Sequence, residues 1–271
     1  MRNIQPIKIQ KRKEFAKKYY NKDYDKLNDV EFYIINTNAE IWAYIESIVP
    51  DTYANYTIMD FTGNDKRKNK DISLLNSSVV KKIKNNICKY CWGMTWEDIR
   101  KKYPDENDKS IIKIFRNKDI MQKRLKEGNN VIVYGESNKP MGRTLIASII
   151  MKEAIKLRKY SKNKIQTYDW VDFSTLRKAL VADDYEASDY YSCDWLVVDD
   201  INKNFFTTKA QRNFLSECMN PFFMKRLRHK QPTILVFRFD ITDADVSIED
   251  DLGVGISSVI NNKKTFLIPL N

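Results

Sequence analysis

The stretch of this sequence most typical of a phosphate site is "VIVYGESNKPMGRTLIASII" at 131–150, where a glycine-containing turn separates a strand-like apolar run from a helical run. Gly135 follows the apolar run, and Gly142 precedes Arg143 and Thr144. In a phosphate loop, consecutive backbone N–H groups surround the phosphates at a helix N-terminus, where the helix dipole adds positive potential. These four residues are therefore our candidate nucleotide-binding residues, with ATP as the expected ligand.

The turn departs from the usual spacing G-x-x-x-x-G-K-[ST], in which the lysine contacts the β- and γ-phosphates and the hydroxyl binds Mg²⁺. Six residues rather than four separate the glycines, and Arg143 occupies the lysine position. Arg143 keeps the positive charge, but its planar guanidinium is not a conservative replacement for an ammonium. Thr144 keeps the hydroxyl that a magnesium ion requires.

A second motif, "WLVVDD" at 195–200, ends an apolar strand with Asp199 and Asp200, and Asp199 comes 55 residues after Thr144. In P-loop ATPases an acid at the end of such a strand holds the Mg²⁺ shell, and a nearby polar residue positions the attacking water. We therefore assign Asp199, with Thr144, to magnesium and Asp200 to catalysis. The alternative is that paired acids open the loop after the strand. The order of the two motifs favours the nucleotide site.

The elements that must position these residues alternate between strand and helix from about residue 108 onward. Strands are predicted at 130–135, 164–170, 194–201, 232–239 and 263–270. Helices are predicted at 109–128, 143–160, 171–180 and 209–227. Such alternation predicts an α/β fold with a mostly parallel sheet and helices on both faces. We divide the chain into an N-terminal basic helical region (1–62), a linker with a helical insertion (63–107) and the P-loop domain (108–271).

Basic residues are concentrated in two segments, which together form a candidate binding surface for nucleic acid or another partner. Residues 1–26 carry nine Lys and Arg against three acids, interleaved with aromatic residues. The candidate nucleic-acid or partner patch comprises Lys11, Arg12, Lys13, Lys17, Lys18, Lys225, Arg226, Arg228 and Lys230. The net charge of +11 agrees with an anionic partner. The alternatives are a solvated arm whose tyrosines dock on its own domain, and a helix end where cations suit the dipole.

Other features limit the class of protein. No stretch approaches the roughly 20 apolar residues that a membrane span requires, and the first residues lack the apolar core of a signal peptide. We therefore expect a cytoplasmic protein without a membrane partner. Cys88 and Cys91 have metal-ligand spacing, but zinc needs four ligands. With Cys193, Cys218 and His229 elsewhere in the chain, we expect two semi-buried thiols rather than a zinc site.

The order and spacing of five segments resemble the DnaC/DnaI/IstB family of helicase loaders and transposon-associated AAA+ ATPases. These segments are "VPDTYANYTIMDFTG" (49–63), the turn at 131–150, "VDFSTLRKAL" (171–180), "CDWLVVDDI" (193–201) and "FMKRLRHKQPTILVFRFDI" (223–241). The resemblance covers roughly 49–271, interrupted by an insertion-like stretch at 64–107. It implies a P-loop (AAA+/RecA-like) fold that binds ATP and Mg²⁺. It also implies contact with a replicative helicase and with single-stranded DNA or another nucleic acid, and homo-oligomers in open rings or spirals.

Three departures from the family pattern bear on catalysis. Arg143 replaces the lysine, Val236–Phe239 replaces the polar end of the sensor strand, and Val254 rather than an arginine finger follows Leu252-Gly253. A missing finger alone can cost orders of magnitude in rate, so we expect weak or absent hydrolysis and leave open whether the protein is an enzyme. Arg226 and Arg238 are candidate substitutes for the finger.

The expected function is thus that of a helicase-loader-like AAA+ protein in DNA replication that binds nucleotide. Two alternatives remain open from the sequence. One is a catalytically inactive adaptor or scaffold that keeps the ATPase fold. The other is an IstB-like transposition regulator, which would form filaments on duplex DNA.

Overall fold

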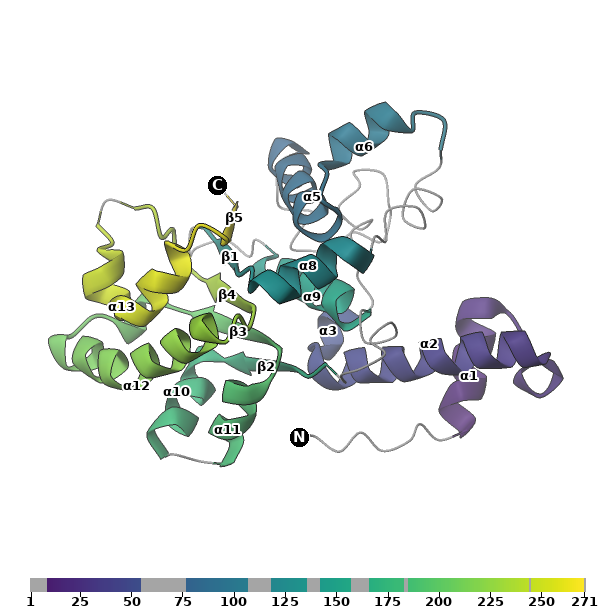
Figure 1. Cartoon of the computed structure of the whole chain (residues 1–271), viewed down its shortest axis with the longest axis horizontal. Helices are drawn as coiled ribbons and strands as arrows, with labels where there is room; N and C mark the ends of the chain where they lie inside the picture. The colour runs from purple at the N-terminus through teal and green to yellow at the C-terminus, as the bar shows by residue number, and fades with distance from the viewer. Residues whose placement is uncertain are drawn as a thin grey trace.

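The computed structural model describes residues 9–54, 77–106, 118–135, 142–156, 166–182, 185–243 and 245–270. Figure 1 shows a sheet flanked by helices and a helical arm that extends away from it. The first part of the linker expected at 63–107, up to residue 76, and the inner residues of the turn, 136–141, lie outside the described residues. No helix among those ranges is long and apolar enough to cross a membrane.

The sheet has five strands in the order β2-β3-β4-β1-β5, and every neighbouring pair is parallel. The strands are β1 (Val131–Tyr134), β2 (Tyr168–Asp172), β3 (Trp195–Ile201), β4 (Thr233–Phe237) and β5 (Phe266–Pro269). β1 and β4 are buried along their whole length, as expected for strands covered on both faces. The predicted α/β class is confirmed.

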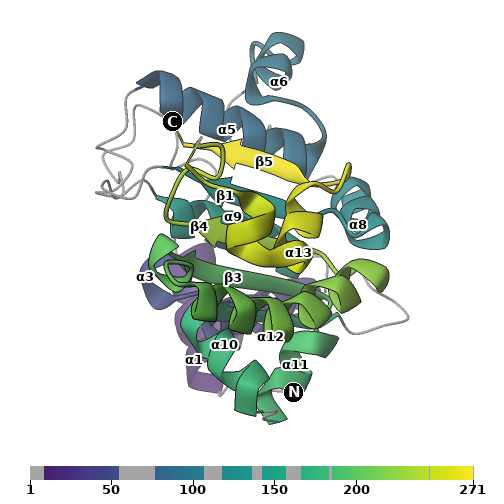
Figure 2. The same cartoon turned by 90° about the vertical axis from the view of Figure 1, so that its left-hand side faces the viewer.

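Figure 2 shows helices on both faces of this sheet. Alternate residues of the strands enter two separate cores, one on each face. Val131 and Val133 face the first core, whereas Ile132 and Tyr134 face the second. Helices of the first core are α2 (Asp29–Ile48), α5 (Ser77–Trp92), α6 (Trp96–Lys102), α8 (Lys118–Glu127) and α9 (Arg143–Ile155). Helices of the second core are α10 (Phe173–Ala182), α11 (Tyr185–Ser192), α12 (Lys209–Arg228) and α13 (Ile248–Ile260). α9 is buried on nearly every side, because it lies between the sheet and the N-terminal helices.

The arm consists of α1 (Ile9–Tyr20), a short 3₁₀ turn η1 (Tyr24–Lys26) and the first half of α2. α1 crosses α2, and Arg12 joins the two helices through hydrogen bonds to Asn36 Oδ1 (2.9 Å) and Glu40 Oε1 (3.1 Å). The second half of α2 packs on the sheet domain, where the hydroxyl of Tyr44 accepts the N–H of Tyr168. One helix therefore connects the arm to the core.

A short helix, α3 (Asp51–Ala54), follows α2 and is held against α9 by a buried lysine. The Nζ of Lys152 donates to the carbonyl oxygens of Tyr53 (2.8 Å) and Ala54 (3.2 Å). A lysine that lies inside a core must find such acceptors, because an unpaired buried charge is costly. These two hydrogen bonds therefore fix α3 to α9.

Cys88 and Cys91 lie one turn apart in α5 and are fully buried, so the expectation of semi-buried thiols underestimates their burial. Burial raises the pKa of Cys88 to about 12. In the described part of the chain, no three His, Cys, Asp or Glu side chains are grouped as they would be around a metal ion. Both thiols serve here as packing groups of the first core.

Candidate nucleotide-binding site

The carboxyl ends of β1, β4 and β3 bring the two sequence motifs to one edge of the sheet. β4 lies between β1 and β3, so the residue after β4 lies between the start of the turn and the paired acids. Backbone hydrogen bonds continue past the strand ends, from Gly135 N–H to Phe239 O (3.2 Å) and from Arg238 N–H to Ile201 O (2.8 Å). Open parallel sheets bind their ligands at this edge.

The turn re-enters the described chain at Gly142, which is the N-cap of α9. Its φ of 67° is left-handed, a conformation that glycine adopts without steric cost. Gly142 has no side chain that could cap the helix, and the first N–H groups of a helix have no acceptor within the helix. The start of α9 is therefore a suitable place for an anion, as the sequence predicts.

Thr144 and Asp199 come together although they are 55 positions apart in the sequence. The Thr144 hydroxyl donates to Asp199 Oδ1 at 3.4 Å, and the same oxygen accepts the N–H of Asp200 at 2.7 Å. Burial is the main cause that raises the pKa of Asp199. A bound cation would oppose that effect, and Mg²⁺ is commonly held by one or two carboxylates together with phosphates. These two side chains fit a magnesium ion that accompanies a nucleotide.

Arg143, at the lysine position, is only 9% exposed and turns back toward the beginning of the turn. Its Nη1 donates to the carbonyl oxygen of Gly135 at 3.0 Å. Burial lowers the pKa of its guanidinium, and the positive charge of Arg238 lowers it further. The charge of Arg143 therefore lies at the base of the turn, close to Arg238.

Asp200 adopts a left-handed backbone conformation, with φ of 62°. The β3–β4 register shifts between Val198 and Ile201, at the place where the chain makes this change. The Asp200 carboxylate forms an ion pair with the Nε of Arg238. Non-glycine residues with positive φ are uncommon and occur often at functional sites. The sequence identifies Asp200, but nothing in it shows that Arg238 is its partner.

Aromatic and ionic contacts hold the loops after β3 and β4 in place. Phe237 and Phe239, on either side of Arg238, are both buried, and their ring centroids are 5.4 Å apart. Phe239 also lies 6.4 Å from the ring of Phe206. Lys203 Nζ approaches Asp243 Oδ2 at 3.4 Å, which joins the two loops. The sequence identifies Phe237 and Phe239 only as departures from the family pattern, and it does not predict these contacts, because they depend on strand order.

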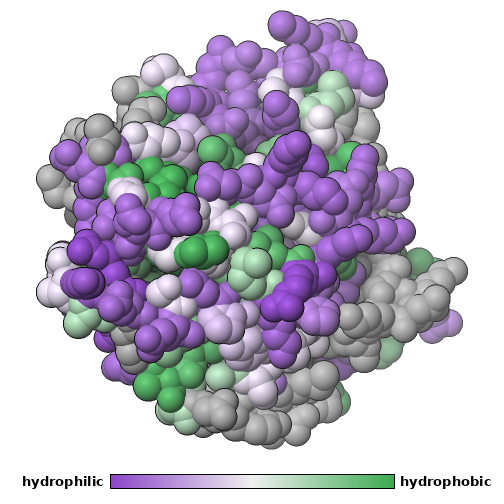
Figure 3. Space-filling view, turned by 60° about the vertical axis from the view of Figure 1, so that its left-hand side comes forward, coloured by the Kyte–Doolittle hydropathy of each residue, from purple (hydrophilic) through white to green (hydrophobic). Residues whose placement is uncertain are grey.

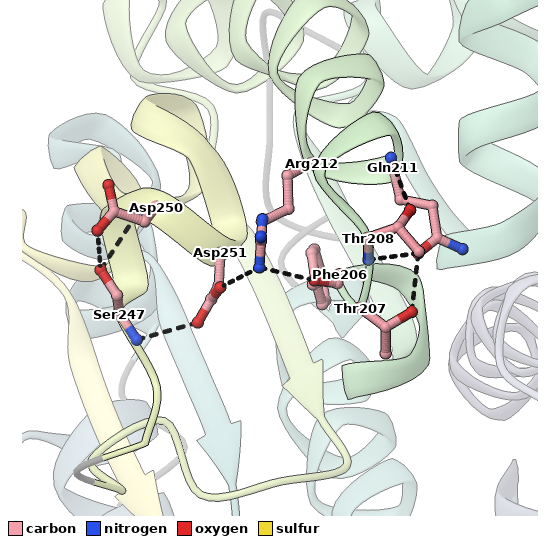
Figure 4. A network of polar contacts seen from close by, with 8 residues as sticks. All are labelled: Phe206, Thr207, Thr208, Gln211, Arg212, Ser247, Asp250 and Asp251. Carbon is pink, nitrogen blue, oxygen red and sulfur yellow. Dashed lines mark hydrogen bonds and ion pairs between the residues drawn. The ribbon is translucent and has the colours of Figure 1, made fainter.

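A polar network joins the beginnings of α12 and α13 next to these loops (Figure 4). Arg212 Nη1 donates to Asp251 Oδ1 (3.2 Å) and to the carbonyl oxygen of Phe206 (3.4 Å). Asp251 in turn accepts the N–H of Ser247 (3.0 Å). The N-terminal ends of the two helices are therefore fixed to the segment that follows β3.

Arg226 does not belong to a surface patch, contrary to the expectation from the sequence. It is 1% exposed and makes hydrogen bonds within the protein. Its acceptors are Thr233 Oγ1 and the carbonyl oxygens of Tyr190, Cys193 and Pro232. Because Pro232 and Thr233 are at the beginning of β4, Arg226 lies at the opposite sheet edge from Asp200. It therefore cannot substitute for an arginine finger at this site.

The remaining residues of the basic patch fall into two groups. Lys11, Lys17 and Lys18 are exposed on α1, whereas Arg12 and Lys13 are engaged within the arm, Lys13 by an ion pair with Asp25. The exposed residues of the second group, at the end of α12, are Lys225, Arg228 and Lys230. The arm and α12 belong to opposite faces of the sheet. The two groups are therefore separate surfaces.

The strand order, the glycine at the start of α9 and the acids at the end of β3 together give the parallel α/β architecture that the sequence predicts. No protein-family model matches the chain, and no curated protein matches it. Several solved structures show a weak similarity.

Three of these structures illustrate the extent of the similarity. AMPPCP-bound DnaA from Aquifex aeolicus is 16% identical, with a TM-score of 0.39, over 56% of this chain and 45% of DnaA. DnaI is 18% identical, with a TM-score of 0.38, over 66% of this chain and 92% of DnaI. A protein described as a putative primosome component from Streptococcus pyogenes serotype M3 is 15% identical, with a TM-score of 0.38. The match covers 60% of this chain and 81% of that protein. This chain thus spans less than half of the DnaA structure.

Proposed function

We propose that this protein binds ATP and Mg²⁺ at the carboxyl edge of β1, β4 and β3, and acts as a helicase-loader-like protein in DNA replication. The observation that carries the proposal is the contact between Thr144 and Asp199, beside the uncapped start of α9. A hydroxyl from the phosphate turn and a carboxylate from a separate strand are the two groups that such a site needs.

Each described residue has a distinct role in this proposal. The Thr144 hydroxyl and the Asp199 carboxylate hold the magnesium ion, which neutralises charge on the phosphates when it is bound. The first N–H groups of α9 face the phosphates, because Gly142 opens that end of the helix. Arg143 contributes positive charge from the base of the turn while it remains bonded to Gly135.

Hydrolysis is weak or absent in this proposal, because the polar groups of the site are already engaged. Asp200, which would position water, is paired with Arg238. Val254, at the finger position, is 49% exposed and carries no charge. These observations favour a second candidate as well, an adaptor that binds nucleotide or a partner without turnover.

The arm supports the proposed contact with a partner. Among the described residues, large exposed hydrophobic side chains concentrate in it, namely Ile9, Tyr19, Tyr20, Val30, Phe32, Tyr33 and Ile34. By contrast, hydrophilic side chains predominate on the face shown in Figure 3, where the apolar ones form small separate groups. Exposed apolar clusters of this kind mark interaction sites. We assign Val30, Phe32, Tyr33 and Ile34 of α2 to a replicative helicase, and the basic face of α1 to single-stranded DNA.

A binding and turnover experiment on the full chain tests this function. Thr144→Ala and Asp199→Ala should each weaken ATP binding at least tenfold in Mg²⁺, because each removes a metal ligand. In EDTA all three proteins should bind equally weakly. Equal affinity of the wild type and both variants in Mg²⁺ would contradict the assigned site.

A phosphate-release assay at low salt, with and without single-stranded DNA, separates the two candidates. DNA-stimulated release that Asp200→Ala abolishes would identify an active loader. Binding of ATP without release would identify the adaptor.

A further inference from the structure

A small pocket lies between α1 and the second half of α2, where the arm joins the sheet domain. Its volume is about 260 Å³, below the roughly 300–1,000 Å³ of pockets that hold drug-sized ligands. Ala39 and Ala43, one turn apart on the same face of α2, line it. Because both side chains are small, the two helices leave a space there that suits a single flat ring.

Three aromatic side chains form a continuous wall of this pocket. Tyr19 lies between the other two, with its ring centroid 4.7 Å from that of Phe15 and 5.3 Å from that of Trp42. The Trp42 ring is held in place because its Nε1 donates to Glu46 Oε1 at 2.7 Å. Tyr19 is 42% exposed, so the wall is accessible from solvent. Aromatic faces of this kind stack with the unpaired bases of single-stranded nucleic acid.

The lysines beside these rings favour an anionic group on the ligand. Lys11 and Lys18 lie about two turns apart on α1 and both line the pocket. Neither forms an ion pair with another described residue, whereas Arg12 and Lys13 are paired within the arm. Aromatic rings alone would also suit a cation, but two lysines repel one. The pair of lysines instead matches the phosphates on either side of a base.

Glu46 gives the pocket a means to select the base. The bond from Trp42 uses one oxygen of its carboxylate, and each carboxylate has two oxygens that accept hydrogen bonds. The N4 amino group of cytosine donates to such an oxygen, whereas the carbonyl oxygen that uracil carries at the same position is itself an acceptor. The pocket therefore matches a base with an exocyclic amino group.

We propose that this pocket binds one amino-bearing base of single-stranded DNA. The base stacks against Trp42 and Tyr19, and its amino group donates to Glu46. The flanking phosphates lie against Lys11 and Lys18. This inference rests on the proposed contact of α1 with single-stranded DNA, and it adds a position and a preference for one base. Binding by stacking and charge alone gives only modest sequence preferences, so a preference that depends on one functional group identifies the pocket.

Two oligonucleotides that differ only in the group at C4 of each base test the preference. Oligo(dC) and oligo(dU) of about twelve nucleotides are titrated with the full chain at neutral pH and fixed salt, and fluorescence anisotropy measures binding. The wild type should bind oligo(dC) about tenfold more tightly, as one hydrogen bond to a charged group predicts. Glu46→Gln should bring the ratio close to one, because an amide both donates and accepts.

Substitutions of the wall and of the floor test the pocket itself. Trp42→Ala should weaken oligo(dC) binding about tenfold through lost stacking, whereas Trp42→Phe should keep most of the affinity. Ala43→Leu fills the space but keeps the surrounding rings and charges. Because leucine is a good helix former, this variant should fold and yet lose the preference for oligo(dC). Tyr33→Ala, at an exposed ring elsewhere on α2, is the matched control and should bind as the wild type does.

The outcomes separate this inference from the proposed function. Equal affinity of the wild type for both oligonucleotides would overturn the pocket and leave the contact of α1 with DNA in place. Wild-type binding by both Trp42→Ala and Ala43→Leu would do the same. Failure of the wild type to bind either oligonucleotide at low salt would overturn the pocket and that contact together, whereas ATP binding at the sheet edge is measured independently.

Discussion

At the scale of single residues, two arginines that the sequence presents as equivalent have opposite roles. Arg226 is enclosed at the amino edge of β4 and binds carbonyl oxygens of α11, of the turn that follows it and of Pro232. Arg238 lies at the carboxyl edge of the same strand and pairs with Asp200. The sequence shows that both arginines flank one strand, but burial alone determines which of them is available to a ligand.

Arg226→Ala should destabilise the protein by about 3 kcal/mol or more, because several buried carbonyl oxygens would lose their donor. Urea unfolding followed by circular dichroism measures the change. Arg228→Ala, an exposed neighbour on the same helix, should change the free energy of unfolding by less than about 0.5 kcal/mol. Equal effects of the two substitutions would show that the hydrogen bonds of Arg226 contribute little.

At the scale of elements, the packing of α12 against α13 supports the loops that hold Asp200 and Arg238. Gly253 interrupts α13 with φ of 80° and ψ of 160°. Two residues later, the N–H of Gly255 donates to Asn220 Oδ1 of α12 at 2.7 Å. The two helices approach so closely at Gly255 that a Cβ atom there would lie 2.7 Å from the Cα of Asn220.

Gly255→Ala should therefore force α12 and α13 apart and cost about 1–3 kcal/mol of stability, the usual range for overpacking. Thermal unfolding measures the loss. Val254→Ala is the matched control, since Val254 is half exposed on the adjacent position. A variant with an alanine at 255 that is as stable as the wild type would contradict the close approach.

The sequence predicted the strands better than it predicted the helices of the second core. Continuous apolar runs identified β1, β3 and β4, because both faces of a parallel sheet are buried. α11 and α13 were not predicted, since one is polar and tyrosine-rich and the other contains two glycines. The strand predicted at 164–170 is β2 at Tyr168–Asp172, where Asp172 also accepts the N–H of Thr175 at the start of α10.

The residues of the candidate site were likewise predicted only in part. Gly142, Thr144 and Asp199 were predicted from motif spacing, and the structure brings Thr144 and Asp199 into contact. The partnership of Arg238 with Asp200 was not predictable, because it depends on strand order and on the left-handed backbone of Asp200.

At the scale of the whole molecule, a single long helix joins two parts with different surfaces. Figure 1 shows the arm extending away from the sheet domain. The sheet domain carries the candidate nucleotide site, whereas the arm carries exposed aromatic side chains and lysines. Tyr19 and Tyr20 lie beside Lys17 and Lys18 on α1, and both tyrosines are partly exposed. Bases of single-stranded nucleic acid stack on such rings while lysines contact the phosphates.

Binding of a single-stranded DNA oligonucleotide should depend on the arm more than on α12. Replacement of Lys11, Lys17 and Lys18 by Glu should weaken binding at least tenfold and reduce the dependence of affinity on salt, because fewer counterions are released. Fluorescence anisotropy over a salt series measures both quantities. The matched triple replacement of Lys225, Arg228 and Lys230 by Glu should have the smaller effect, and the reverse order would assign DNA to α12.

The central claim is that the edge formed by β1, β4 and β3 binds ATP with Mg²⁺, and calorimetric titration of the wild-type chain tests it most directly. The account predicts saturable binding of ATP in Mg²⁺ at micromolar to submillimolar concentration, weakened by EDTA and by Asp199→Ala. Absence of binding at millimolar ATP would contradict it. The turn after β1 would then keep the form of a phosphate site without its function.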